Sequence, residues 1–258
     1  MKLCRFIQQG QFVPRYGIVE GDVVRPLMDE DGFGVSPRAS TDKIPVKDVV
    51  MLAPVVPSKI VCVGRNYVDH AIELGNPVPI DPLLFLKAPS TVIASGDDIL
   101  IPPQSTQVEH EGELGAVIGR TASKLSDSDD PLAYVLGFTC VNDVTARDLQ
   151  RKDVQFTRAK SFDTFCPVGP WIVTDADPLD LAITTHVNGQ LKQNSRTSSM
   201  TFSVPFLIQY ISHMMTLNPG DLIATGTPAG VSRLVDGDVV SVEVEGIGVL
   251  RNCVKRLD

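Results

Sequence analysis

Short runs of aliphatic and β-branched residues, each closed by Gly, Pro or Asp, recur along most of this chain of 258 residues. Runs of this length between turn-forming residues are typical of β-strands. The 20 Gly and 19 Pro residues agree with a chain rich in strands and tight turns. At least eight strands are expected, among the segments 59–64, 82–87, 91–96, 113–119, 134–143, 170–175, 182–189, 221–226, 238–246 and 248–256.

Helical patterns are fewer than strand patterns. Residues 69–75 form a short turn that ends at Gly75, and residues 145–153 (TARDLQRKD) open at Thr145. Apolar residues in 203–217 recur near the helical spacing before a Pro-Gly stop. Because these helices interrupt the strands without alternating with them, we predict an α+β fold with a mixed β-sheet.

The beginning of the chain differs from the rest. It consists of short strands and turns followed by a polar stretch at 29–43, which we expect to be an exposed loop. These features predict a small β-rich domain at 1–55 and a larger catalytic domain at 56–258.

Charge and composition point to a small-molecule partner. The formal net charge is −8 and no Lys or Arg cluster stands out, which argues against nucleic acid or an anionic membrane as partner. No apolar run is long enough to span a bilayer and no secretory signal is evident, so we expect a cytoplasmic protein. The five cysteines lack a C-x-x-C pair, which argues against disulfides and a thiolate zinc site. Nucleotide-binding and serine-nucleophile motifs are also absent from the sequence.

The strongest chemical signal is QVEHEGELGAVIG, in which Glu109, Glu111 and Glu113 alternate with other residues. Residues two apart in a strand point to one face, so these carboxylates would converge on one cation. The alternative is a solvated strand face whose charges discourage edge pairing. The apolar LGAVIG that follows suggests that the acidic end leaves the core at a rim. The same alternation places His110 on the opposite face.

Asp143 supplies a third carboxylate where an apolar run ends and a helix begins. It could instead cap that helix, with Thr145 and Asp148 in a capping-box arrangement. Together with Glu111 and Glu113, it would form an all-oxygen triad, which suits Mg²⁺, Mn²⁺ or Ca²⁺ rather than zinc.

A possible general base lies earlier in the chain. His70 and Glu73 are three residues apart on a predicted helical turn, so their side chains are neighbours. A carboxylate beside an imidazole raises its basicity and fixes its tautomer, as a base acting on water requires. The alternative is an ordinary surface pair. Residues 75–82, rich in Pro and Gly, could form the arm of a lid.

Eight segments, in order and at about the usual spacing, resemble the fumarylacetoacetate hydrolase superfamily, from about Lys59 to the end of the chain. They are CVGRNYVDH, LFLKAPST, HEGELGAVIG, NDVTARDLQ, AKSFDTFCPVGPW, VNG, TSSMTFSVP and TGTPAGV. The resemblance implies a β-roll fold, a homodimer, and a Mg²⁺ or Mn²⁺ ion held by Glu111, Glu113 and Asp143. It also implies that His70 and Glu73 activate water on a lid. Further residues that it places in the pocket are Arg147, Gln150, Lys160, Gly226 and Thr227.

The predicted function is hydrolysis of the C–C bond of 2,4-dioxo acids, that is, acylpyruvates such as fumarylpyruvate or acetylpyruvate. The 2-oxo acid end would chelate the ion, Lys160 would stabilise developing negative charge, and His70 with Glu73 would activate water. Two alternatives stay open. The same site could decarboxylate or tautomerise oxaloacetate or isomerise a 2-hydroxydienoate, or the chain could be a non-catalytic metal-binding β-module.

Overall fold

The structure is a computed structural model that describes residues 1–28 and 38–257. Most of the polar stretch expected as an exposed loop, residues 29–37, lies outside the described residues. In the described part of the chain, no helix combines the length and the apolar character needed to cross a membrane.

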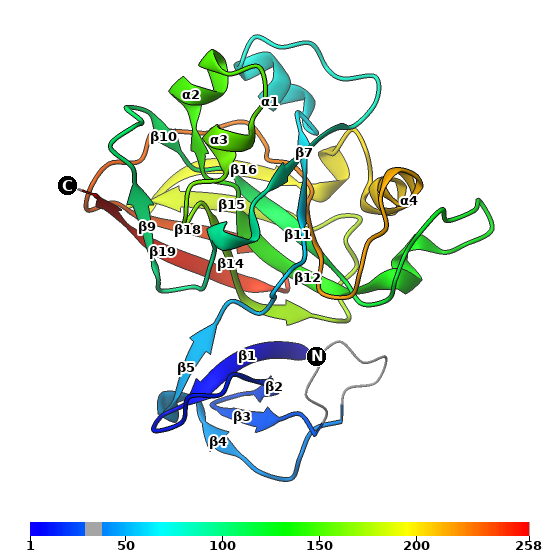
Figure 1. Ribbon diagram of the computed structural model, residues 1–258, viewed down its shortest axis with the longest axis vertical. Helices are drawn as coiled ribbons and strands as arrows, with labels where there is room; N and C mark the ends of the chain where they lie inside the picture. The colour runs from blue at the N-terminus through cyan, green and yellow to red at the C-terminus, as the bar shows by residue number, and fades with distance from the viewer. Residues whose placement is uncertain (29–37, 258) are drawn as a thin grey trace.

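The described residues are mainly β-strands joined by short connections (Figure 1). The strands are β1 Lys2–Gln8, β2 Arg15–Glu20, β3 Val23–Pro26, β4 Ile44–Pro45, β5 Val49–Leu52, β6 Ile60–Gly64, β7 Leu83–Lys87, β8 Val92–Ile93, β9 Asp98–Ile101, β10 Val108–Glu109, β11 Gly112–Ile118, β12 Val135–Asn142, β13 Thr145–Ala146, β14 Cys166–Val173, β15 Ala182–Val187, β16 Gln190–Arg196, β17 Leu222–Ala224, β18 Val239–Val244 and β19 Gly248–Arg256. The α-helices are α1 Val68–Glu73, α2 Arg147–Lys152, α3 Thr157–Lys160 and α4 Val204–Met214. Short 3-10 helices cover Val46–Asp48, Pro89–Thr91, Pro131–Tyr134 and Thr197–Ser199.

Two sheets carry the fold. The larger has the order β4-β3-β2-β1-β14-β12-β11-β17-β6-β7, with β5 paired to β1 and β8 paired to β14. The second has the order β16-β15-β18-β19-β9. Both mix parallel and antiparallel pairs, since β17 runs parallel to β6 and β19 runs parallel to β9. The predicted α+β class with a mixed sheet is therefore confirmed.

The two sheets pack face to face through β11, β12 and β14 of the larger sheet and β15, β18 and β19 of the smaller. The main hydrophobic core lies in this interface and extends to α4. It includes Leu114 and Phe138 from the larger sheet, Val242 and Leu250 from the smaller, and Leu207 from α4. This packing fixes the ends of β11 and β12, which carry the candidate site.

Strands β1 to β5 form the lower part of the molecule in Figure 1. They are continuous with the larger sheet, because β1 pairs with β14 through Lys2 opposite Val173 and Leu3 opposite Ile172. The division at residue 55 stays a prediction.

Two strands after residue 55 lie in segments for which the sequence indicated no element. The first, β16, reads QLKQNSR, which has almost no apolar residue. It pairs along one side only, with β15, so its side chains are largely solvated. The second, β9, is a short strand whose apolar side chains Ile99 and Ile101 are buried.

Gly112 lies where β11 crosses β15, and a Cβ atom built there would come within 2.1 Å of Thr185 Oγ1. That hydroxyl is buried and has no hydrogen-bond partner among the described residues. We predict that Gly112→Ala lowers the free energy of unfolding by about 1 to 3 kcal/mol, because overpacking forces the strands apart. Urea denaturation measures this change.

The control is the same substitution in two Thr185 backgrounds. Thr185→Ala removes the obstructing hydroxyl, so Gly112→Ala should cost much less there. Thr185→Val keeps the bulk at that position, so the full cost should persist. An equal cost in both backgrounds would contradict the proposed overlap.

Candidate active site

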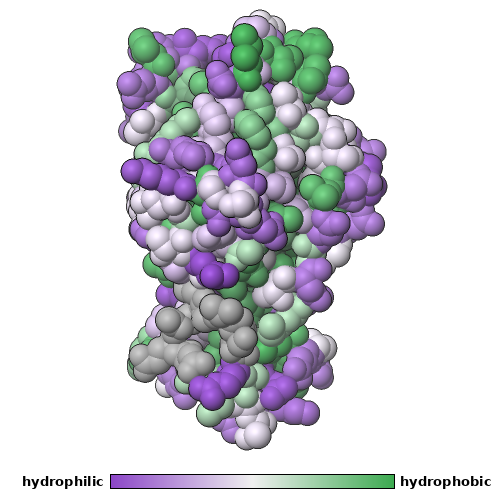
Figure 2. All heavy atoms as spheres, turned by 90° about the vertical axis from the view of Figure 1, so that its right-hand side faces the viewer, coloured by the Kyte–Doolittle hydropathy of each residue, from purple (hydrophilic) through white to green (hydrophobic). Residues whose placement is uncertain are grey.

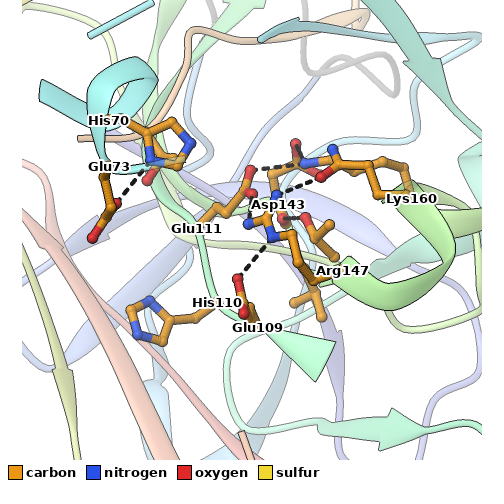
Figure 3. Close-up of polar contacts among 12 residues, drawn as sticks. His70, Glu73, Glu109, His110, Glu111, Asp143, Arg147 and Lys160 are labelled. Atoms are coloured by element: carbon orange, nitrogen blue, oxygen red, sulfur yellow. Dashed lines mark hydrogen bonds and ion pairs between the residues drawn. The ribbon is translucent and has the colours of Figure 1, made fainter. Parts of the chain in front are cut away.

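Three carboxylates converge at the adjacent ends of β11 and β12, and two of them, Glu111 and Asp143, are labelled in Figure 3. Glu113 lies on β11, Glu111 is the residue directly before β11, and Asp143 is the residue directly after β12. The backbone locks these positions, since the Asp143 N–H donates to the Glu111 carbonyl at 2.8 Å and the Glu111 N–H donates to Asn142 Oδ1 at 2.9 Å. One ligand oxygen from each carboxylate lies within 4.8 Å of the others. The predicted triad is thus brought together.

Two details of the acidic segment were predicted wrongly. The segment is not one continuous strand, because β10 ends at Glu109 and β11 begins at Gly112. The carboxylates also do not stand at an exposed rim: Glu109, Glu111 and Glu113 are only 6%, 4% and 2% exposed. Burial is possible because basic side chains, described next, neutralise most of the charge.

Three basic side chains interlock with these carboxylates. Lys160 Nζ lies 2.7 Å from Glu111 Oε2 and 2.6 Å from Asp143 Oδ2. Lys87 Nζ lies 2.6 Å from Asp143 Oδ1. Arg147 Nε lies 2.7 Å from Glu109 Oε2, and its Nη2 also pairs with Glu111.

The network fixes the protonation of its members. Burial alone would raise the pKa of Glu111, but the charges of Lys160 and Arg147 outweigh burial and hold that pKa below its usual value. Burial likewise opposes the charge on Lys160, yet Asp143 and Glu111 raise its pKa above the usual value. Both groups are therefore charged at neutral pH.

Glu113 is the exception. Its Oε2 accepts a hydrogen bond from the Gly226 N–H at 2.7 Å, and no basic side chain of the described residues pairs with it. Burial, and then the negative charges of Asp143 and Glu111, raise its pKa well above the usual range. A divalent cation between the three carboxylates would relieve this repulsion, and oxygen-only ligands suit a hard ion. The residues present therefore fit the predicted metal.

His70 and Glu73 form the second half of the site. His70 lies on α1 and is 4% exposed, and its Nδ1 is 3.2 Å from Glu73 Oε2. Glu73 Oε1 in turn accepts a hydrogen bond from the Gly230 N–H at 3.0 Å. His70 and Glu111 line the same cavity. The pair is therefore an anchored part of the site rather than a surface pair.

One cavity connects these groups. Its lining includes every residue predicted for the site except Glu73 and Gly226: His70, Glu111, Glu113, Asp143, Arg147, Gln150, Lys160 and Thr227. Glu73 and Gly226 support the cavity instead, by holding His70 and Glu113.

Three of the residues that the resemblance places in the pocket already have hydrogen-bond partners within the protein. The Gly226 N–H donates to Glu113, and the Thr227 hydroxyl donates to the Gly112 carbonyl at 2.9 Å. Gln150 Oε1 accepts from Arg147 Nη1 at 2.6 Å. Their contact with a substrate stays a prediction.

The alternative role for Asp143 is wrong. Helix α2 begins at Arg147 and has no side-chain cap. Thr145 Oγ1 donates back to the Asp143 carbonyl, and Asp148 instead accepts from Ser105 Oγ at 2.7 Å. No capping box forms, so Asp143 is free to serve the site.

His110 points away from Glu111, as predicted (Figure 3). Its ring nitrogens lie 3.2 Å from Gln193 Oε1 and 2.9 Å from Ser232 Oγ. Burial lowers its pKa to about 4. A neutral imidazole in this position supports the structure behind the site.

Several residues of the site were not predicted from the sequence. Lys87 ends an apolar strand, and nothing in the sequence distinguishes it from a solvated lysine at a strand end. The cavity wall adds residues that no pattern singled out: Arg65, Leu74, Asn76, Leu83, Phe85 and Phe156.

Apolar side chains are exposed around α1 and the segment after it. Val68, Ile72, Val78 and Ile80 are 44%, 66%, 37% and 94% exposed. Figure 2 shows hydrophobic groups at the end of the molecule that carries α1 and α2 in Figure 1. This exposure is consistent with the predicted lid, whose movement stays a prediction.

Comparison with known proteins identifies the class to which this fold and site belong. The family described as Fumarylacetoacetate (FAA) hydrolase C-terminal matches residues 59–255, and the family described as Rv2993c-like, N-terminal matches residues 1–54. The chain therefore belongs to the fumarylacetoacetate hydrolase family.

Its relatives carry several activities. The human mitochondrial protein named Oxaloacetate tautomerase FAHD2B is 43% identical over 239 residues, which cover 86% of this chain and 76% of that protein. The 5-carboxymethyl-2-hydroxymuconate delta-isomerase of Mycobacterium smegmatis has 43% identity and a TM-score of 0.92 over 100% of both chains. The maleylpyruvate hydrolase of Sphingobium sp. SYK-6, solved with manganese(II) and pyruvate, has 30% identity and a TM-score of 0.80 over 100% of both chains. Members of the family are thus hydrolases, isomerases and tautomerases.

We predict that Glu113→Gln weakens the affinity for Mg²⁺ and Mn²⁺ by at least about 10- to 100-fold. That is the usual cost of losing a residue that only hydrogen-bonds to a metal ligand. The metal-free variant should be as stable as the parent or more stable at pH 7. The raised pKa of Glu113 means that its ionisation destabilises the fold as pH rises through that value, and glutamine cannot ionise. Calorimetric titration and thermal denaturation, each with and without chelator, measure the two effects.

The matched control is Glu243→Gln, which removes one carboxylate from an exposed position on β18. It should alter neither metal affinity nor the metal-induced rise in Tm. Unchanged affinity in Glu113→Gln would exclude Glu113 as a ligand.

Proposed function

We propose that the protein is a Mg²⁺- or Mn²⁺-dependent enzyme that enolises 2-oxo acids and hydrolyses the C–C bond of acylpyruvates. The observation that carries this proposal is the anchored His70–Glu73 pair, which faces the buried carboxylates across one cavity. A metal-binding module without catalysis would have no use for a buried histidine held by a carboxylate in that position.

The ion, when bound, supplies positive charge that polarises the 2-oxo acid end of the substrate. Lys160 adds a fixed charge, because two carboxylates hold its ammonium group inside the cavity. Arg147 stays charged for the same reason and keeps Glu111 in place. Negative charge that develops on the enolate oxygen is therefore met by preorganised groups rather than by mobile water.

His70 would act as the base. Glu73 holds Nδ1, which leaves Nε2 to accept a proton from water. The resulting hydroxide adds to the distal carbonyl carbon, C4. The bond between C3 and C4 then breaks, and its electron pair forms the pyruvate enolate. Proton transfer to C3 gives pyruvate, and the acyl part leaves as a carboxylic acid.

Oxaloacetate tautomerisation is a second candidate. The human relative at 43% identity carries that name. In this reaction the same base would move a proton between C3 and the enol oxygen, and no water would attack carbon. The two candidates share enolate stabilisation and differ in the use of water.

His70→Ala separates the two. If His70 activates water, hydrolysis of acetylpyruvate should fall by about 10² to 10⁴, the usual contribution of a general base. Exchange of the C3 protons in D₂O should survive in part, because Lys160 and the ion stabilise the enolate without His70. NMR follows exchange and hydrolysis together, after correction for spontaneous exchange.

The control is His213→Ala, since His213 is exposed on α4 and lies outside the cavity lining. If exchange and hydrolysis vanish together, His70 is the enolising base and the tautomerase candidate is favoured. Hydrolysis that persists within a few-fold would show that His70 does not activate water.

A further inference from the structure

We propose that Arg65 binds the distal carboxylate of the substrate, so that the enzyme selects dicarboxylic 2-oxo acids over monocarboxylic ones. This inference rests on the proposed function, because it assumes that the 2-oxo acid end binds at Glu111, Glu113 and Asp143. It adds a specificity-determining residue and narrows the substrate class.

The backbone at Arg65 is held in an unfavourable conformation. Its φ is 59°, in the left-handed region where residues other than Gly, Asn and Asp are uncommon. Asn66 fixes the chain next to it: its side chain donates to the carbonyls of Phe202 and Thr225 at 3.0 and 2.8 Å, and its Oδ1 accepts from the Phe202 N–H at 2.8 Å. Glycine would adopt this turn at lower cost. A long cationic side chain at a strained position that lines a cavity is consistent with a functional role.

Arg65 is the cationic group of the cavity without an internal partner. Lys160 and Arg147 are each paired with two carboxylates. By contrast, within residues 1–28 and 38–257 no hydrogen bond, ion pair or ring contact engages the Arg65 guanidinium, although Arg65 lines the same cavity and is half-buried. A free, partly desolvated guanidinium is suited to a carboxylate, which it can bind through two parallel hydrogen bonds.

The remaining wall favours a substrate with a polar far end. Besides Arg65 and the carboxylate cluster, the lining includes the apolar side chains of Leu83, Phe85 and Phe156. The aromatic rings of Phe85 and Phe156 pack edge to face at 5.6 Å. Such a wall accommodates the carbon chain, and Arg65 meets a charge at its end.

The experiment compares ligands that differ only in the distal group and that need not react. The C5 pair is 2-oxoglutarate and 2-oxopentanoate, and the C6 pair is 2-oxoadipate and 2-oxohexanoate. Calorimetry measures their Kd for the Mg²⁺-loaded parent and for Arg65→Gly. In at least one pair, the parent should bind the dicarboxylate more tightly. Arg65→Gly should weaken that dicarboxylate about 10- to 100-fold, as expected for a lost hydrogen bond to a charged group, and change its monocarboxylate partner less than about threefold.

Arg65→Gly also controls for folding. Because glycine relieves the left-handed backbone, its Tm should equal or exceed that of the parent. The matched control is Lys124→Gly, which removes a cation from another left-handed position, with φ 53°, outside the cavity. It should leave every Kd unchanged.

Two results with the parent would overturn the proposal: equal affinity for both members of each pair, or binding of neither. Two results with Arg65→Gly would also overturn it: unchanged affinity for the dicarboxylates, or an equal loss of affinity for both members of a pair. The proposed function is judged separately, by turnover of acylpyruvates and oxaloacetate with the parent. If the parent turns over substrate but Arg65 makes no difference between dicarboxylate and monocarboxylate affinity, only the role of Arg65 is rejected. If Arg65 makes that difference but the parent shows no turnover, only the proposed function is rejected.

Discussion

The buried ion network around Asp143 is the interaction on which the rest of the site depends. Lys87 and Lys160 hold its two oxygens, and Lys160 and Arg147 together hold Glu111. Removing one partner from such a pair typically costs about 3 to 5 kcal/mol, because a buried charge is left uncompensated. The fold must therefore bring these side chains together from β7, the residue before β11, the residue after β12, α2 and α3. The packed core between the two sheets provides the rigid support for that convergence.

The network leaves one carboxylate, Glu113, without a basic partner among the described residues. Glu113 receives a single backbone hydrogen bond, and its neighbours Asp143 and Glu111 repel it. A protein optimised only for stability would replace or pair this side chain. A divalent cation bound between this carboxylate and the other two would relieve the repulsion, so metal binding would also stabilise the site.

Much of this arrangement could be predicted from sequence because the signals are local. Period-two spacing grouped Glu111 with Glu113, although it also included Glu109, which pairs with Arg147 instead. Helical spacing was sufficient to pair His70 with Glu73. Helix α4 follows from its apolar period, although it ends at Met214, before the Pro-Gly at 219–220. Lys87 and Arg65 could not be predicted in this way, because a lysine at a strand end and an arginine after a glycine are usually solvated. Only the tertiary structure shows that one is buried against Asp143 and that the other lines the cavity.

The turn at residues 226–230 links the two halves of the site. Its first glycine, Gly226, donates to Glu113, and its last, Gly230, donates to Glu73, so one short segment positions both a candidate metal ligand and the carboxylate that pairs with His70. Both glycines have positive φ, and a Cβ atom would lie 2.7 Å from Asn66 Cβ at Gly226 and 2.0 Å from the Lys192 carbonyl oxygen at Gly230. The turn therefore cannot accept side chains at these two positions without moving, and any movement would shift Glu73 and Glu113 together.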